Sequence, residues 1–182
     1  MEGVRELKYR RWFHALDIDN DGAITRQDAH LLAERLTGLT NPRRPSQAQR
    51  LSEAAANAWD RVIGRFDHNF DSRVEEEEMV ATLRQTLTTR DSYSQQLQPI
   101  IDAYFDLVDT DRDGAIGPDD YARVYQAATH NRAEDGAEIF DYLDLEGRGT
   151  VSREQFHRAF TEFFYSDNPN ARANNLLGRL PA

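Results

Sequence analysis

Aspartate side chains recur at alternate positions in two short segments of the chain. The two runs are Asp17, Asp19 and Asp21, and Asp109, Asp111 and Asp113. Carboxylates this close repel one another unless a cation lies among them. Carboxylate oxygens suit hard divalent cations such as calcium, which takes six to eight oxygen ligands at about 2.3–2.6 Å. The spacing therefore predicts two metal sites.

Each run opens a 12-residue segment that can complete a cage of oxygens. In loop I, residues 17–28, Gly22 allows the sharp turn with positive φ that brings the ligands together. Ala23 then offers its backbone carbonyl, and Asp28 closes the cage. Loop III, residues 109–120, repeats the predicted ligands and the turn: Asp109, Asp111, Asp113, Gly114, Ala115 and Asp120. We predict that both loops bind a divalent cation.

A third segment, loop II (residues 67–78), keeps the ligands but changes the turn. Its predicted ligands are Asp67, Asn69, Asp71, the backbone carbonyl of Arg73, and Glu78. Ser72 stands where the other two loops have glycine, and a non-glycine residue pays about 1–2 kcal/mol for a left-handed conformation. Loop II is therefore predicted to bind more weakly than loops I and III.

A fourth segment, loop IV (residues 144–155), has lost its metal-binding character. Asp144 and Glu146 remain, but Arg148 places a cation where an anion is needed, and the neutral Gln155 replaces the closing carboxylate. We predict that loop IV binds no metal and supports its partner loop structurally.

These four segments resemble EF-hand loops, most strongly in loops I and III. One departure affects the choice of ion: Asp28 and Asp120 stand at the twelfth position, and Asp is one methylene shorter than Glu. Bidentate ligation is then harder, which favours six-coordinate magnesium relative to a loop closed by Glu. We expect Ca²⁺ as the bound cation, with Mg²⁺ competing in loops I and III.

Apolar residues at helical spacing flank every loop, as Phe13 and Leu16 do before loop I and Leu32 and Leu36 after it. The expected fold is all-α, a compact EF-hand fold of eight helices in two pairs. EF-hand loops pair through a short strand contact at the eighth position, here Ile24, Val74, Ile116 and Val151. We predict an N-terminal pair in residues 1–90, a C-terminal pair in residues 91–166, and a tail, residues 167–182, that packs on the globule.

The composition excludes several classes of function. The 182 residues carry a formal net charge of −10, which disfavours binding to nucleic acid or to an anionic membrane surface. With no cysteine, the chain has no disulfides and no thiolate metal sites. The five histidines have no metal-ligand spacing, and no phosphate-binding or nucleophile motif is present, so we predict no enzyme activity. No apolar run approaches the roughly 20 residues of a membrane span, and we expect a cytoplasmic monomer.

Over nearly its whole length the chain is similar to the calerythrin and sarcoplasmic calcium-binding protein family. The likeness lies in the uneven spacing of the four loops and in the tail sequence around Phe163–Pro169 and Asn175–Gly178. The resemblance implies a compact globule that buffers calcium or shapes its signals. Many members have a silent second loop and a working fourth, whereas here the fourth is damaged, so their usual occupancy does not transfer.

Two roles remain open for a protein of this kind. Methionine is scarce, at two residues, whereas sensors that bind many targets use flexible Met-rich grooves. Leu176, Leu177 and Leu180 of the tail can fill a groove that a target helix would otherwise enter. We therefore favour a calcium buffer, with a sensor that exposes an apolar surface to a protein partner as the alternative.

Overall fold

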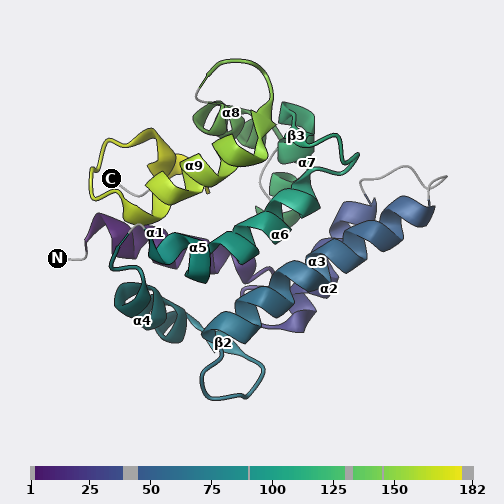
Figure 1. Ribbon diagram of the computed structural model, residues 1–182. Helices are drawn as coiled ribbons and strands as arrows, with labels where there is room; N and C mark the ends of the chain where they lie inside the picture. The colour runs from purple at the N-terminus through teal and green to yellow at the C-terminus, as the bar shows by residue number, and fades with distance from the viewer. Residues whose placement is uncertain (1–2, 39–44, 90, 130–132, 145, 178–182) are drawn as a thin grey trace.

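Apolar stripes on both sides of each loop produce the helices that flank it. The computed structural model describes residues 3–38, 45–89, 91–129, 133–144 and 146–177. Within these residues eight helices flank the four loops, and the strands are limited to two short pairs (Figure 1). The predicted all-α EF-hand fold with strand contacts between paired loops is confirmed.

The N-terminal half holds loops I and II. Its elements are α1 (Val4–Leu16), β1 (Ala23–Ile24), α2 (Arg26–Gly38), α3 (Pro45–Phe66), β2 (Val74–Glu75) and α4 (Glu76–Thr86). Strands β1 and β2 pair antiparallel, with Ile24 opposite Val74 and both side chains fully buried. This contact fixes the position of loop I relative to loop II.

The C-terminal half holds loops III and IV. Its elements are α5 (Ser92–Gln96), α6 (Gln98–Val108), β3 (Ala115–Ile116), α7 (Pro118–Thr129), α8 (Ala133–Leu143), β4 (Val151–Ser152), α9 (Arg153–Tyr165) and a short 3₁₀ helix, η1 (Arg172–Asn175). Strands β3 and β4 pair antiparallel, with Ile116 opposite Val151. Ser152 and Gln155 form a reciprocal capping box at the start of α9, which satisfies backbone N–H groups that the helix leaves unpaired.

The two halves share one hydrophobic core. Trp12 of α1 contacts Phe66 of α3 and Phe164 of α9 edge to face, with ring centroids 5.8 and 4.8 Å apart. Helix α3 also runs beside α6 of the other half (Figure 1). Because the core is continuous, the division at residues 90 and 91 stays a prediction. Among the described residues, no helix combines the length and the apolar character that crossing a membrane requires.

The C-terminal segment lies against this core as far as it is described. The Tyr121 hydroxyl donates a hydrogen bond to the Leu176 carbonyl oxygen at 2.7 Å, and the Leu176 side chain is fully buried. The Asn174 amide donates to the carbonyl oxygens of Asn168 and Pro169 at 2.9 and 3.0 Å, which holds the turn before η1. Residues 178–182 of the predicted tail lie outside the described residues.

Candidate metal centres

All four loops have left-handed residues at the same two positions, although their side chains differ. The fourth and sixth residues of each loop have positive φ: Asn20 (58°), Gly22 (89°), Phe70 (61°), Ser72 (65°), Arg112 (62°), Gly114 (86°), Gly147 (64°) and Gly149 (74°). These left-handed turns fold the chain back on itself and direct the odd-numbered side chains inward. The predicted differences in metal binding therefore depend on the side chains and not on these turns.

In loop I three carboxylates converge on one volume. One oxygen from each of Asp17, Asp19 and Asp21 lies within 4.8 Å of the others. Backbone N–H groups hold them there: Gly22 donates to Asp17 Oδ2 at 3.1 Å, and Ala23 donates to Asp21 Oδ1 at 2.9 Å. Burial raises the pKa of Asp17 above its ordinary value, and the Asp28 and Asp19 charges add to this rise. A divalent cation among these oxygens would relieve both the desolvation and the repulsion.

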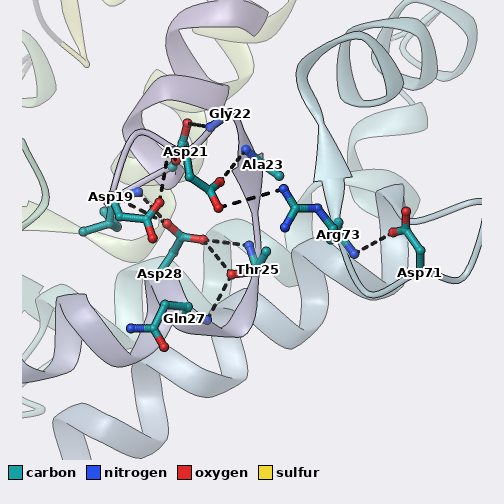
Figure 2. Close-up of polar contacts among 11 residues, drawn as sticks. Asp19, Asp21, Gly22, Ala23, Thr25, Gln27, Asp28, Asp71 and Arg73 are labelled. Atoms are coloured by element: carbon teal, nitrogen blue, oxygen red, sulfur yellow. Dashed lines mark hydrogen bonds and ion pairs between the residues drawn. The ribbon is translucent and has the colours of Figure 1, made fainter.

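Asp28 closes loop I from the side of α2 (Figure 2). Its Oδ1 accepts from the backbone N–H of Ile18 at 2.8 Å, and its Oδ2 accepts from the N–H of Thr25 at 2.7 Å. The carboxyl is fully buried, and this burial raises its pKa. Asp28 thus joins the two ends of the loop, but its oxygens are not within the cluster formed by the first three aspartates. Its predicted role as a ligand stays a prediction.

Loop III repeats this arrangement in the C-terminal half. Oxygens of Asp109, Asp111 and Asp113 lie within 4.8 Å of one another. Asp109 Oδ1 is buried and has no hydrogen-bond partner. A buried, unpaired carboxylate oxygen is costly unless a cation satisfies it, so this loop fits a divalent ion. Asp120 accepts from the Gly117 N–H at 3.2 Å, as Asp28 does from Thr25.

Loop II brings its predicted ligands together in the same way. The N–H of Asp71 donates to Asp67 Oδ1 at 3.2 Å and to Asn69 Oδ1 at 3.0 Å. Glu78 Oε1 accepts from the N–H of His68 at 2.8 Å, as Asp28 does from Ile18 in loop I. Ser72 occupies the left-handed position with φ of 65°, where the sequence predicts a conformational cost.

Loop IV contains a cation of its own. The Arg148 guanidinium lies 2.9 Å from Glu146 Oε2, which places an ion pair across the positions that supply ligands in the other loops. The two oxygens of Asp144 accept from the N–H groups of Arg148 and Gly149 at 3.0 and 2.6 Å. Gln155 is committed to the capping box of α9. This arrangement supports the prediction that loop IV binds no metal.

The seventh residue of each loop lies at the short strand contact. Ala23 begins β1, Ala115 begins β3, and Arg73 directly precedes β2. Their predicted roles as carbonyl ligands stay predictions. The sequence did not lead us to expect that the Arg73 side chain points from loop II toward Asp21 of loop I (Figure 2). The expected antiparallel pairing of loops I and II was the signal from which this contact could have been predicted.

A small apolar cavity, about 50 Å³ in volume, lies in the core between the two halves. Trp12, Trp59, Ile101, Tyr104, Val124 and Leu177 are among the residues that line it. The indole Nε1–H of Trp59 is buried without a hydrogen-bond partner. The sequence pattern did not predict a cavity among these residues.

Comparison with known proteins agrees with the geometry of the loops. Residues 10–28 and 100–125 match the family model described as EF hand, and they contain loop I and loop III. Over 179 residues the chain is 24% identical to a luciferin-binding protein of Renilla reniformis, covering 97% of this chain and 94% of that protein. It is 23% identical to calerythrin of Saccharopolyspora erythraea, covering 87% and 88% of the two chains. It is 24% identical to the beta chain of a Penaeus sarcoplasmic calcium-binding protein, covering 90% of each.

Two solved structures show how far the fold is shared. The calcium-loaded apo form of a coelenterazine-binding protein from Renilla muelleri superposes with a TM-score of 0.82 at 21% identity, covering 99% of each chain. A calcium-binding protein of Streptomyces coelicolor superposes with a TM-score of 0.66 at 26% identity, covering 88% of this chain and 97% of that one. The resemblance to calerythrin and the sarcoplasmic calcium-binding proteins is confirmed.

Proposed function

We propose that this EF-hand calcium-binding protein, a relative of calerythrin and the sarcoplasmic calcium-binding proteins, is a calcium buffer. Loops I and III are its main sites, and loop II is a weaker third site. The observation that carries the proposal is the convergence of three carboxylates in each main loop, together with the unpaired, buried Asp109 Oδ1. Calcium supplies the positive charge that these oxygens lack.

The side chains that would hold the ion follow the predicted pattern. In loop I they are those of Asp17, Asp19, Asp21 and Asp28, joined by the backbone carbonyl of Ala23. In loop III they are those of Asp109, Asp111, Asp113 and Asp120, joined by the backbone carbonyl of Ala115. Each bound divalent ion offsets two of the ten excess negative charges. Binding should therefore stabilise the folded state, because the carboxylates within each empty loop repel one another.

A buffer, unlike a sensor, needs no apolar surface that opens for a target. Met79 is fully buried, and Phe70 is the one large apolar side chain that is exposed among the described residues, at 88%. Leu176 and Leu177 of the C-terminal segment are packed into the core. These features support a rigid globule. We further propose that it is a monomer in the cytoplasm and has no catalytic activity.

A sensor is the second candidate, because the Streptomyces coelicolor relative is described as acting in calcium-mediated regulation. A hydrophobic dye separates the two roles. If the protein is a buffer, dye fluorescence stays constant or falls when calcium is added to metal-free protein, as the chain becomes more compact. A rise in dye fluorescence on calcium addition would instead favour a sensor with a protein partner.

A binder of a luciferin-type ligand is the third candidate, favoured by the cavity beside Trp59 and by the Renilla reniformis relative. The volume argues against it: pockets for drug-sized ligands enclose about 300–1,000 Å³, and an apolar cavity of about 150 Å³ accepts benzene. A cavity of about 50 Å³ is smaller than either. Titration with coelenterazine, followed by tryptophan fluorescence, should show no saturable binding; saturable quenching would support this third candidate.

A further inference from the structure

Arg73 belongs to loop II, but its side chain extends toward loop I. The strand register places Ala23 opposite Glu75 and Ile24 opposite Val74. Extending that register by one residue sets Arg73 across from Thr25, the ninth residue of loop I. A long side chain at this position therefore lies beside the oxygen cage of the neighbouring loop.

The guanidinium is directed at one of the predicted ligands. Arg73 Nη2 lies 3.9 Å from Asp21 Oδ2, and both side chains are 47% exposed (Figure 2). Arg26, which is the tenth residue of loop I itself, pairs instead with Asp60 at 2.8 Å. Arg73 thus places a fixed positive charge next to the site where loop I would hold its ion.

In the C-terminal pair, the strand position that matches Arg73 carries no charge. There Ile116 lies opposite Val151, so the residue that corresponds to Arg73 is Thr150 of loop IV. Thr150 is uncharged, and loop III therefore has no cation in the place from which Arg73 approaches loop I. Loop III has an arginine at a different ligand, since Arg123 Nη1 lies 3.5 Å from Asp120 Oδ1.

We propose that Arg73 lowers the calcium affinity of loop I, by repelling the incoming ion and by stabilising the empty loop through Asp21. A ligand oxygen lies about 2.3–2.6 Å from bound calcium, so the guanidinium is roughly 6–8 Å from the ion. At that distance a unit charge acting on a divalent ion at the protein surface changes affinity by about three- to tenfold. The proposal rests on the proposed function, because it requires loop I to bind calcium.

The test isolates loop I in a background of Asp67→Ala and Asp109→Ala, which removes loops II and III as sites. Calcium binding is measured by titration calorimetry in 10 mM KCl. Arg73→Thr should raise the affinity of loop I about three- to tenfold. The charge-conserving control Arg73→Lys should leave it within about twofold of the parent value. Raising KCl to 1 M shortens the Debye length to about 3 Å and should remove most of the difference.

The reciprocal variant tests the same charge in the other pair. In a background of Asp17→Ala and Asp67→Ala, Thr150→Arg should lower the affinity of loop III by a similar factor. Unchanged loop I affinity in Arg73→Thr, or an equal gain in Arg73→Lys, would overturn the inference while leaving calcium binding intact. Absence of calcium binding by loop I in the parent background would overturn both the inference and the assignment of loop I as a site.

Discussion

The hydroxyl of Tyr121 donates a hydrogen bond to the backbone carbonyl oxygen of Leu176 at 2.7 Å, and both residues are fully buried. Tyr121 directly follows Asp120, the last residue of loop III. The C-terminal segment is therefore attached to the first turn of α7, next to a proposed metal site. The position of the C-terminal segment should therefore depend on whether the start of α7 is well ordered.

Removing this hydrogen bond should destabilise the protein. Tyr121→Phe leaves the Leu176 carbonyl unpaired in the core, at a cost of about 1–3 kcal/mol in the free energy of unfolding. Tyr142→Phe is a suitable control, because Tyr142 is only partly buried. Denaturant unfolding would compare the two variants, and equal stabilities would contradict the role given to the contact.

Deleting residues 170–182 should expose the apolar surface that Leu176 and Leu177 cover. Binding of a hydrophobic dye to the calcium-saturated protein should then increase. Dye binding that matches that of the full chain would show that the segment covers no apolar surface in solution.

Loop II should bind calcium more tightly when the residue at its left-handed turn is glycine. Ser72 has φ of 65°, and glycine adopts this conformation without steric cost. Ser72→Gly should raise the calcium affinity of loop II about threefold or more, because glycine removes about 1 kcal/mol of strain that the bound loop must bear and that the empty loop avoids by leaving the left-handed conformation. Trp59, on α3 before this loop, provides a fluorescence signal. A matched variant with Asp67→Ala should abolish the calcium-dependent change, and an unchanged midpoint in Ser72→Gly would argue against strain as the cause of weak binding.

The choice between calcium and magnesium should depend on the twelfth residue. Asp120 is held by the Gly117 N–H and the Thr110 hydroxyl, at 3.2 and 3.1 Å. Asp120→Glu adds one methylene and allows bidentate contact, which suits calcium and not magnesium. In excess magnesium, the variant should bind calcium at loop III more tightly than the parent, by about tenfold. Equal calcium affinities in magnesium would show that the length of this side chain does not determine selectivity.

The pH dependence of stability in the alkaline range should report the lowered pKa of the buried Lys8. Its ammonium group donates to the Ser166 carbonyl oxygen at 2.6 Å between α1 and the end of α9. Burial lowers the pKa of Lys8 from 10.5 to about 8. Between these values the unfolded chain binds more protons than the folded one, so the Lys8 contribution to stability rises with pH. Relative to Lys8→Met, the parent should gain roughly 2 kcal/mol in unfolding free energy from pH 7.5 to pH 10.

Urea unfolding of the parent and of Lys8→Met across this pH range measures the gain in unfolding free energy. Subtracting one free energy from the other removes the contribution of every group that titrates in both proteins. Tyr9 is one of these, since burial raises its pKa to about 12. A difference that is constant with pH would mean that Lys8 keeps its ordinary pKa in the folded protein.

The sequence predicted the parts of the structure that depend on local patterns. The spacing of Asp17, Asp19 and Asp21 predicted their convergence, because a 12-residue loop with a left-handed sixth residue brings alternate side chains together. The left-handed turns at Gly22 and Gly114 were equally local. These features involve residues close in sequence, so their contacts follow from the backbone conformation.

The parts that the sequence did not predict join residues far apart in the chain. The contact between Arg73 and Asp21 depends on the strand register, and the cavity beside Trp59 depends on how the two halves pack. The burial of Lys8 between α1 and α9 runs against the usual exposure of lysine. Tertiary packing determines all three features, and no local sequence pattern specifies them.

Calorimetric titration of metal-free protein with calcium tests the central claim most directly. We predict two tight sites, with a weaker third, and loss of one tight site in each of the variants Asp17→Ala and Asp109→Ala. Binding should also raise the melting temperature, because the ion stabilises loops that repel themselves when empty. If the chelator-treated chain takes up no calcium at millimolar concentration, or if both variants keep every site, the assignment of loops I and III as metal centres is wrong.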